Sequence, residues 1–549
     1  MNGNQTKHFL LYYKETITRK WNDDAIEDYK GTVKYTFGEM AEQMARIGIL
    51  FKNAGIKKGD KIALCSPNST NWAVTFLAVA AYEGVGVSIM ANFATETIEG
   101  LVNHSDSKIL FAAQNVQNQV NPANMPNLEG IVSLDNFEMV YGTEQFKKAM
   151  NNWDADFKAA YPNGFSKEDL NYNTDNLDQL ALINYTSGTT SSPKGVMLSY
   201  RSISSNCQFA IDYIPIPENG KLLELLPMAH MFGLMFEFIF TLAGGAHVVV
   251  LTKAPAPQIL MQAFQDVKPF MVLSVPLIIE KIFKGKIFPA IKKPAIKILW
   301  HIPIIGGLIK KKVYTQLQQA FGGNLERLII GGAALNKEVE RCLRDIKFPY
   351  CVGYGMTEAG PLIAYTDYKT YKMYSCGRSC DRMEAKIDSS NQQKVVGEIL
   401  CKGDNVMLGY YKNEEATKAT FTADGWLKTG DLGIIDKNGN IFIRGRNKNM
   451  ILGPSGQNIY PEELEDKLNN LEGVIESIVV ERDGKLVGLV YPDLTVAEKL
   501  GISADELMKQ NIQKLNKVVP SFCHLSKIEL MKEEFAKTPK NSIKRFMYK

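Results

Sequence analysis

A segment rich in hydroxyl side chains, residues 185–195, has the composition of a phosphate-binding loop. It reads Tyr-Thr-Ser-Gly-Thr-Thr-Ser-Ser-Pro-Lys-Gly and contains six Ser and Thr hydroxyls. Glycines let backbone N–H groups turn inward, hydroxyls add neutral donors, and Lys194 adds a positive charge. The apolar run 180–183 predicts a buried strand that leads into the loop. We interpret the segment as a polyphosphate site; the alternative is a Ser/Thr-rich surface turn.

Two common nucleotide-binding patterns are absent from the sequence. A Walker A loop needs Gly-Lys-Ser/Thr at a fixed spacing, whereas here Lys194 precedes Gly195. Gly353 and Gly355 begin like a Gly-x-Gly-x-x-Gly fingerprint, but Glu358 occupies the third glycine position. The pattern therefore disfavours a P-loop kinase or GTPase and a nicotinamide dehydrogenase.

Composition narrows the class of protein further. The 549 residues predict two or more domains, and 45% apolar with 22% charged residues is ordinary for a globular protein. A net charge of +4 disfavours a dedicated nucleic-acid binder. The eight cysteines are scattered and form no zinc pattern, which fits a reducing compartment. With no signal-peptide pattern and no apolar run of about 18 residues, we expect a cytoplasmic protein.

One stretch departs from this average composition. Residues 281–325 contain no Asp or Glu, and lysines alternate there with large apolar residues. Such a mixture suits peripheral contact with the inner, anionic face of a membrane, through Lys281 to Lys312. The alternative is a pair of amphipathic helices packed on the core with solvated lysines. Pro289, Pro294 and Pro303 are expected to break any long helix.

The order of apolar runs predicts an α/β fold. Between residues 60 and 450, short apolar runs alternate with helical patterns, which indicates largely parallel sheets covered by helices. Residues 397–442 carry shorter runs with a tight turn at 437–440, which predicts an antiparallel hairpin. A small α+β unit follows, and we expect domains at 1–445 and 446–549.

Five further motifs follow the phosphate loop in order. They are His230-Met231-Phe232-Gly233, Gly331-Gly332-Ala333-Ala334, Gly353-Tyr354-Gly355-Met356-Thr357-Glu358-Ala359, Trp426-Leu427-Lys428-Thr429-Gly430-Asp431 and Arg444-Gly445-Arg446-Asn447-Lys448. Over roughly residues 30–546, this set resembles the adenylate-forming superfamily of acyl-CoA synthetases, luciferases and adenylation domains. The phrases at 230–233 and 425–431 are most similar to long- or medium-chain fatty acid–CoA ligases.

The resemblance implies a fold and a two-step reaction. The fold would be a large N-terminal domain of mainly parallel sheets flanked by helices, with a distorted antiparallel barrel-like part, and a small, mobile α+β C-terminal domain. A carboxylate would attack the α-phosphate of ATP, giving acyl-AMP and pyrophosphate. Coenzyme A would then take the acyl group after the small domain has rotated.

The resemblance also implies roles for the phosphate-side residues. The β- and γ-phosphates would be held by Thr186, Ser187, Gly188, Thr189, Thr190 and Lys194. Glu358 would coordinate Mg²⁺, and Thr357 would donate to the α-phosphate. The alternative for Glu358 is a carboxylate that stabilises a helix N-terminus.

The nucleoside and acyl sides follow from the same resemblance. Adenine and ribose would contact Gly332, Ala333, Tyr354, Gly355, Asp431 and Arg446. His230, with Gly332 and Gly355, would line the substrate site, although a lone histidine among apolar residues is commonly a core residue. It needs no acid–base role, because a carboxylate is already ionised near neutral pH.

The resemblance also implies a hinge residue and a binding region for coenzyme A. Lys448 would be the hinge, with a solvated lysine as the alternative. Ser455 and Gly456 would lie near the pantetheine tunnel.

The sequence departs from the family pattern at two positions. Ser191 replaces a glycine of the phosphate loop, and Ser542 occupies the position of the catalytic C-terminal lysine. Serine cannot supply the positive charge that stabilises the adenylation transition state. Lys540 or Lys544 could replace that lysine, because lysine has a long, flexible side chain. If neither does, we expect a slow ligase or one that uses a preformed adenylate.

We therefore expect an ATP-dependent fatty acid–CoA ligase that uses ATP, Mg²⁺ and coenzyme A. An aryl-acid–CoA ligase remains an alternative, as does a weakly catalytic protein that binds acyl-adenylate or nucleotide. Acyl chain length, the choice between coenzyme A and a carrier protein, and oligomeric state are left open by the sequence.

Overall fold

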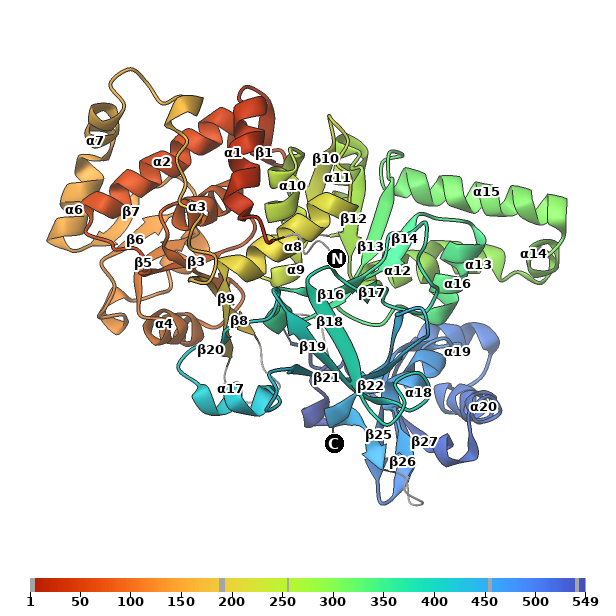
Figure 1. The fold of residues 1–549 in the computed structure, drawn as a ribbon. Helices are drawn as coiled ribbons and strands as arrows, with labels where there is room; N and C mark the ends of the chain where they lie inside the picture. Colours follow the sequence, from red (N-terminus) through yellow and green to blue (C-terminus); the bar gives the residue numbers. More distant parts are fainter. Residues whose placement is uncertain (1–4, 187–192, 254–255, 453–456, 539–542, 549) are drawn as a thin grey trace.

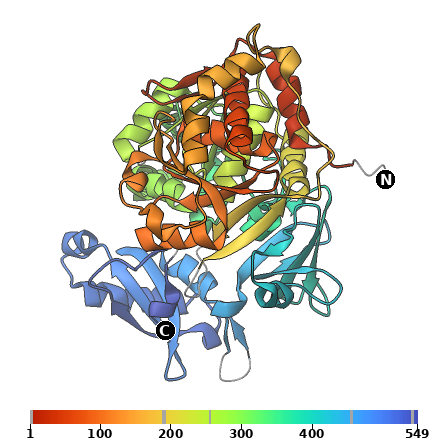
Figure 2. The same ribbon diagram turned by 90° about the vertical axis from the view of Figure 1, so that its left-hand side faces the viewer.

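The computed structural model describes residues 5–186, 193–253, 256–452, 457–538 and 543–548. Two large sheets with helices on their faces make up most of the N-terminal part (Figure 1). A smaller antiparallel sheet and then a compact C-terminal unit follow, and these lie on one side of the two large sheets (Figure 2). The α/β class with parallel sheets, an antiparallel part and a small C-terminal unit is confirmed.

The first large sheet has eight strands and contains the strand that leads into the hydroxyl-rich loop. Its order is β20 (Gly409–Tyr410), β9 (Lys194–Ser199), β8 (Leu180–Thr186), β4 (Val85–Met90), β3 (Lys61–Ser66), β5 (Ser107–Ala112), β6 (Gly130–Ser133) and β7 (Met139–Gly142). The strands from β8 to β6 are parallel to one another. Strand β9 is antiparallel to β8, β20 is antiparallel to β9, and β7 is antiparallel to β6. The predicted strand at 180–183 is the start of β8.

The second large sheet has seven strands. Its order is β14 (Tyr350–Val352), β13 (Arg327–Ile330), β12 (Met271–Ser274), β10 (Lys221–Glu224), β11 (His247–Val250), β1 (Asp24–Asp28) and β2 (Lys34–Thr36). All neighbours are parallel except β1 and β2. Parallel strands end at the same edge, so the loops after β10, β13 and β14 lie along one edge of this sheet.

The helices of the N-terminal part surround these sheets. They are α1 (Phe9–Arg19), α2 (Phe37–Asn53), α3 (Thr70–Ala81), α4 (Thr95–His104), α5 (Gln114–Gln117), α6 (Glu144–Asn151), α7 (Trp153–Ala160), α8 (Tyr200–Tyr213), α9 (Met231–Gly233), the π-helix η3 (Leu234–Ile239), α10 (Phe240–Ala243), α11 (Pro257–Val267), α16 (Lys337–Asp345) and α17 (Glu414–Thr420).

Helix α3 packs on strands of both sheets and is buried over almost its whole length. Its Trp72 stacks on Phe76 at 5.6 Å and meets Phe238 edge-on, which joins the two layers in one core.

Two antiparallel sheets follow in the chain. One is β15 (Tyr354–Gly355), β16 (Leu362–Tyr365) and β17 (Arg378–Ser379); the other is β18 (Met383–Asp388), β19 (Gly397–Gly403), β21 (Leu427–Ile435) and β22 (Ile441–Arg446). The predicted hairpin is confirmed as β21 and β22, and its turn uses Gly439 at φ +82°. Strand β22 ends at Arg446, next to the expected domain boundary.

The C-terminal unit, the described residues after Arg446, has cores of its own. Its elements are β23 (Ile451–Leu452), β24 (Asn458–Ile459), α18 (Pro461–Leu468), β25 (Val474–Arg482), β26 (Lys485–Pro492), α19 (Leu494–Leu500), α20 (Ala504–Asn516) and β27 (Leu525–Leu530). Leu468, Val479 and Leu507 are buried in one cluster that contains residues of this unit alone. Pro461 opens α18, and acidic residues occupy its first turn, both of which favour a helix start.

The lysine-rich stretch is helical, and its prolines start helices. It contains α12 (Pro276–Ile282), the π-helix η4 (Phe283–Ile287), α13 (Phe288–Ile291), α14 (Pro294–Leu299) and α15 (Pro303–Ala320). The expected break is absent at Pro289, because α12, η4 and α13 follow one another without a gap. Pro294 and Pro303 do break the run, since each is the first residue of a new helix, and Pro303 opens one of 18 residues. Proline is tolerated there because the first N–H of a helix has no intrahelical partner.

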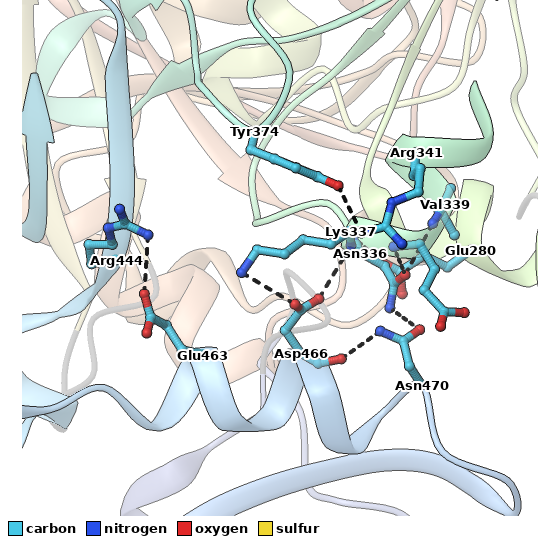
Figure 3. A network of polar contacts seen from close by, with 11 residues as sticks. Glu280, Asn336, Lys337, Val339, Arg341, Tyr374, Arg444, Glu463, Asp466 and Asn470 are labelled. Carbon is cyan, nitrogen blue, oxygen red and sulfur yellow. Dashed lines mark hydrogen bonds and ion pairs between the residues drawn. The ribbon is translucent and has the colours of Figure 1, made fainter. Parts of the chain in front are cut away.

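A polar contact joins the C-terminal unit to the N-terminal part. Figure 3 shows the start of α16 facing α18, with the Asn336 side-chain amide donating to Asn470 Oδ1 at 2.7 Å. Lys337 Nζ lies 3.5 Å from Asp466 Oδ2, and its backbone N–H also donates to Asp466. Lys284 Nζ donates to a backbone carbonyl of the same unit at 3.1 Å. These contacts are polar, which suits an interface that can separate.

We expect Lys337→Glu to loosen this contact, because it places two like charges opposite each other. Hydrogen–deuterium exchange of the segments 333–341 and 460–470 should rise by about fivefold, the scale of one exposed ion pair. The exchanged pair Lys337→Asp with Asp466→Lys should restore slow exchange. Unchanged exchange in Lys337→Glu, or an equal rise in the control Lys509→Glu, would show that the ion pair does not hold the two parts together.

Candidate functional site

The ends of strands from both large sheets bring the predicted site residues together. Strand β8 leads into the loop that starts after Thr186, and Lys194 opens the returning strand β9. Strand β13 leads to Gly332, and β14 leads to Tyr354. In open α/β sheets, ligands bind at this carboxyl edge of the strands. Ser187, Gly188, Thr189 and Thr190 lie outside the described residues, so their expected roles stay predictions.

A buried carboxylate forms the centre of the first cluster. The Tyr354 hydroxyl donates to Asp431 Oδ2 at 2.8 Å, and Arg446 Nε lies 3.1 Å from Asp431 Oδ1. Tyr354 and Asp431 are only 6% exposed, whereas the Arg446 side chain is mostly exposed. Burial raises the pKa of Asp431, and the Arg446 guanidinium counters this rise. Three residues predicted to contact the nucleoside thus meet, with Asp431 held as a hydrogen-bond acceptor.

A second cluster joins Lys194 and Glu358 through a tyrosine. Tyr410, on the edge strand β20, donates its hydroxyl to Glu358 Oε1 at 2.9 Å. Lys194 Nζ lies 4.8 Å from the centre of the same ring, in a cation–π contact. Sequence reasoning missed Tyr410, because its place depends on the pairing of β20 with β9.

Glu358 and Thr357 form a single 3₁₀ turn, η5 (Thr357–Ala359). Thr357 is buried and Glu358 is half-buried, with one carboxylate oxygen engaged by Tyr410. Glu358 lies in the first turn of this short helix, as its alternative reading required. Among the described residues, no side chain donates a hydrogen bond to the second carboxylate oxygen of Glu358, which could therefore bind a cation.

Two of the residues predicted to contact the nucleoside are glycines at positions where a side chain is not accommodated. Gly332 is exposed at φ +84°, a conformation that residues with a Cβ rarely adopt. A Cβ on Gly355 would lie 2.0 Å from the carbonyl oxygen of Pro361. Neither position therefore accepts a larger residue. Ala333, the residue after Gly332, is exposed.

The loop 225–230, which carries His230, is held by the amide side chains of buried Asn184 and half-buried Asn68. Asn184, on β8, donates to the carbonyl oxygen of Ala229 at 2.8 Å. Asn68 accepts from Met228 N at 2.8 Å and donates to another carbonyl of the loop at 2.7 Å. His230 is half-buried, and its Nδ1 accepts from the backbone two residues on. Asn184 thus ties this loop to the strand that leads into the hydroxyl-rich loop.

Two buried acids lie beneath the same loop. Glu237, in η3, accepts N–H groups of Leu225 and Leu226 at 3.0 and 2.7 Å. Burial raises the pKa of Glu237 to about 8 and raises that of Glu224, which also faces Glu237, well above its ordinary value. Burial therefore favours the protonated form of both acids. No motif in the sequence identified them.

The remaining predicted residues belong to the C-terminal unit. Lys448 is exposed in the 3₁₀ turn η6 (Asn447–Asn449), directly after β22. Lys544 is half-buried, and its backbone N–H donates to Ala536 within the C-terminal unit. The structure therefore does not bring Lys544 to Glu358 or Asp431 through any described contact. Lys540, Ser542, Ser455 and Gly456 lie outside the described residues.

A large hollow of about 800 Å³ lies further along the strand ends, between the two sheets. Asn68 is in its wall, but so are Asp28, Lys30, Asp135 and Lys253. This charged lining does not suit an aliphatic chain. No group of three or more His, Cys, Asp or Glu side chains placed to hold a metal occurs among the described residues.

The family model and the similar proteins that were found all belong to enzymes of one kind. A family model described as AMP-binding enzyme matches residues 13–411. A long-chain-fatty-acid–CoA ligase of Mycobacterium bovis, FadD15, is 27% identical over 500 residues, covering 86% of this chain and 77% of that protein. Long-chain-fatty-acid–CoA ligase 1 of Saccharomyces cerevisiae is 27% identical over 557 residues, covering 91% and 78%.

A solved structure extends the likeness to nearly the whole chain. The anthranilate CoA ligase AuaEII in complex with anthranoyl-AMP superposes with a TM-score of 0.81 and 19% identity, covering 99% of this chain and 97% of that one. At this identity the likeness concerns the fold, including its large N-terminal and small C-terminal parts.

The hydrogen bond from Tyr354 to Asp431 gives a test of the first cluster. Tyr354→Phe should raise the KM for ATP roughly tenfold, because it removes a donor to a buried carboxylate. Tyr200→Phe is the matched control: it also removes a buried hydroxyl, bonded to two backbone carbonyls, but far from the cluster. A KM that rises equally in both variants would mean that Tyr354 acts through general stability.

The buried acid Glu237 should make stability depend on pH. Its pKa rises from 4.5 to about 8 on folding, so its contribution is full below pH 4.5 and is lost as pH rises through 8. Glu237→Gln keeps an oxygen for both backbone N–H groups but cannot titrate. Urea unfolding should then show a smaller fall in stability from pH 4.5 to pH 8 than in the wild type, with Glu224 retaining its own share.

Glu384→Gln, on an exposed part of β18, is the control for that experiment and should leave the pH profile unchanged. A Glu237→Gln profile that overlays the wild type would show that Glu237 does not carry the proton.

Proposed function

The chain belongs to the AMP-binding enzyme family, and on that premise we propose that it is an ATP-dependent fatty acid–CoA ligase. The reaction would join a carboxylate to the α-phosphate of ATP with release of pyrophosphate. The acyl group would then pass from AMP to the thiol of coenzyme A. Supporting the choice of acid, the fatty acid–CoA ligases of M. bovis and S. cerevisiae each align over more than four fifths of the chain.

The observation that carries the proposal is the pairing of the two clusters. Tyr354, Asp431 and Arg446 present a buried acceptor and an exposed cation, which suits a ribose with its two hydroxyls. Lys194 and Glu358 meet at Tyr410, which suits a polyphosphate and its cation. Tyr354 on β15 and Glu358 in η5 are separated by only three residues, so the two clusters adjoin in the chain. A single nucleotide would contact both.

Mg²⁺ fits the second cluster. Mg²⁺ is usually held by one or two carboxylates together with substrate phosphates, and Glu358 supplies one half-exposed carboxylate. When bound, the metal would supply positive charge that offsets repulsion between the phosphates and the incoming carboxylate. Thr186, Thr357 and Lys194 would orient the phosphate oxygens through their hydroxyl and ammonium groups.

We place the domain boundary at 445/446, with Lys448 as the hinge between the half-reactions. The polar contact between α16 and α18 would then hold one of two orientations of the C-terminal domain. The polar character of the contact supports this, because polar interfaces between domains separate more easily than large apolar ones. Lys540 or Lys544 would approach the nucleotide only in the other orientation.

The test is pyrophosphate release from ATP and Mg²⁺ with a panel of aliphatic and aromatic carboxylic acids, with and without coenzyme A. Release that requires a medium- or long-chain acid and yields acyl-CoA supports the proposal. Preference for an aromatic acid would make the protein an aryl-acid–CoA ligase. Thioester formation from synthetic acyl-AMP, without release from any free acid, would locate the deficit at Ser542.

Glu358→Gln should slow pyrophosphate release by about 100-fold and raise the Mg²⁺ concentration needed for half-maximal rate, since a carboxylate ligand is lost. Tyr410→Phe should cause a smaller loss, because it frees Glu358 without removing its charge. Glu398→Gln is the control, an acid of the same antiparallel part that accepts the N–H of Gly430. An unchanged Mg²⁺ dependence in Glu358→Gln would remove the metal role.

A further inference from the structure

Two helices project from the N-terminal part and form what we call the arm, residues 293–312. In Figure 1, α15 extends away from the seven-stranded sheet, and α14 lies at its far end. The arm therefore ends well clear of the nucleotide clusters. Among the described residues, no helix has the length and apolar character needed to cross a membrane.

The arm exposes large aliphatic side chains. They are Ile298 (70% exposed), Ile302 (40%), Ile304 (81%), Ile305 (42%) and Leu308 (65%). All five lie within eleven residues of sequence, around the turn between α14 and α15. Apolar groups gathered in this way mark a surface that another phase or molecule covers.

The arm is built to hold these side chains outward. Gly306 packs on the backbone of Trp300, where a Cβ would lie 2.3 Å from the Trp300 carbonyl oxygen. Trp300 is buried, donates to Asp345 at 3.2 Å, and is covered by Lys310 at 5.3 Å. The indole thus takes the inner position, and the isoleucines cannot fold back into the space that it fills.

All charged side chains of the arm are positive. Lys293, Lys297, Lys311 and Lys312 are exposed on it, and no Asp or Glu occurs between residues 281 and 325. The nearby acid Glu338 forms its ion pair with Lys292, at the base of the arm. Exposed aliphatic groups flanked by lysines suit the boundary of an anionic bilayer, where lysines meet head groups and isoleucines enter the acyl region.

We propose that the arm docks this protein on the surface of an anionic lipid bilayer, with Ile304 and Leu308 inserted and Lys311 and Lys312 on the head groups. A second copy of the chain fits less well, because it would place lysines against lysines. An acidic protein would neutralise the lysines but would leave the protruding isoleucines without an apolar partner. The proposal does not depend on the proposed function, since vesicle binding requires neither ATP nor turnover.

The experiment is co-sedimentation of the full chain with vesicles of phosphatidylcholine alone or mixed with phosphatidylglycerol. The wild type should bind the anionic vesicles more tightly and lose binding at high salt. The double variants Ile304→Glu/Leu308→Glu and Lys311→Glu/Lys312→Glu should each bind at least about tenfold more weakly, given about 1 kcal/mol for each lysine at the surface.

The matched control is Leu494→Glu/Leu500→Glu on α19, where both leucines are about half exposed. This variant should bind as the wild type does, and thermal unfolding should show that all three variants fold. Equal binding to neutral and anionic vesicles, no binding at all, or undiminished binding by the arm variants would overturn the proposal. So would sedimentation velocity showing a wild-type dimer that the arm variants dissociate.

Discussion

The buried carboxylate of Asp431 is the interaction on which the site depends. Asp431 lies on β21, its tyrosine donor follows the seven-stranded sheet, and its arginine partner is the last residue of β22. One side chain thus fixes the antiparallel part against the large sheet at the point where the C-terminal unit begins. Burial raises the pKa of Asp431, and the Arg446 charge and the Tyr354 hydrogen bond counter that rise, which favours the ionised form that accepts from both sides.

A second set of contacts connects the strand end proposed to bind the nucleotide with the loop proposed to line the acyl site. Strand β8 carries Asn184, which holds the loop before His230, and the strand then leads into the hydroxyl-rich loop. Glu237 holds the other end of the His230 loop from beneath. The loop therefore has little freedom to shift relative to the strand ends. This rigidity suits a site in which a carboxylate must meet a phosphate at a set distance.

Much of this could be predicted from the sequence, because local patterns report local structure. The apolar run before the loop predicted β8, the turn at 437–440 predicted the hairpin, and the motif residues Tyr354, Asp431 and Arg446 lie together. The hydrogen bond between Tyr410 and Glu358 was not predictable, because the two residues are 52 positions apart in the sequence. They meet only because β20 pairs with β9, and no short sequence pattern indicates that pairing. The buried pair Glu224 and Glu237 was missed for a related reason: each looks like an ordinary polar residue until its neighbours are placed.

Acid-dependent exchange of labelled pyrophosphate into ATP is the measurement that tests adenylate formation most directly. It reports the first half-reaction alone and needs no coenzyme A. The account predicts exchange that requires a fatty acid and Mg²⁺ and that falls to background when Asp431 is replaced by Ala. Exchange that is absent with every carboxylic acid, or that persists in Asp431→Ala, would contradict the central role given to the buried carboxylate.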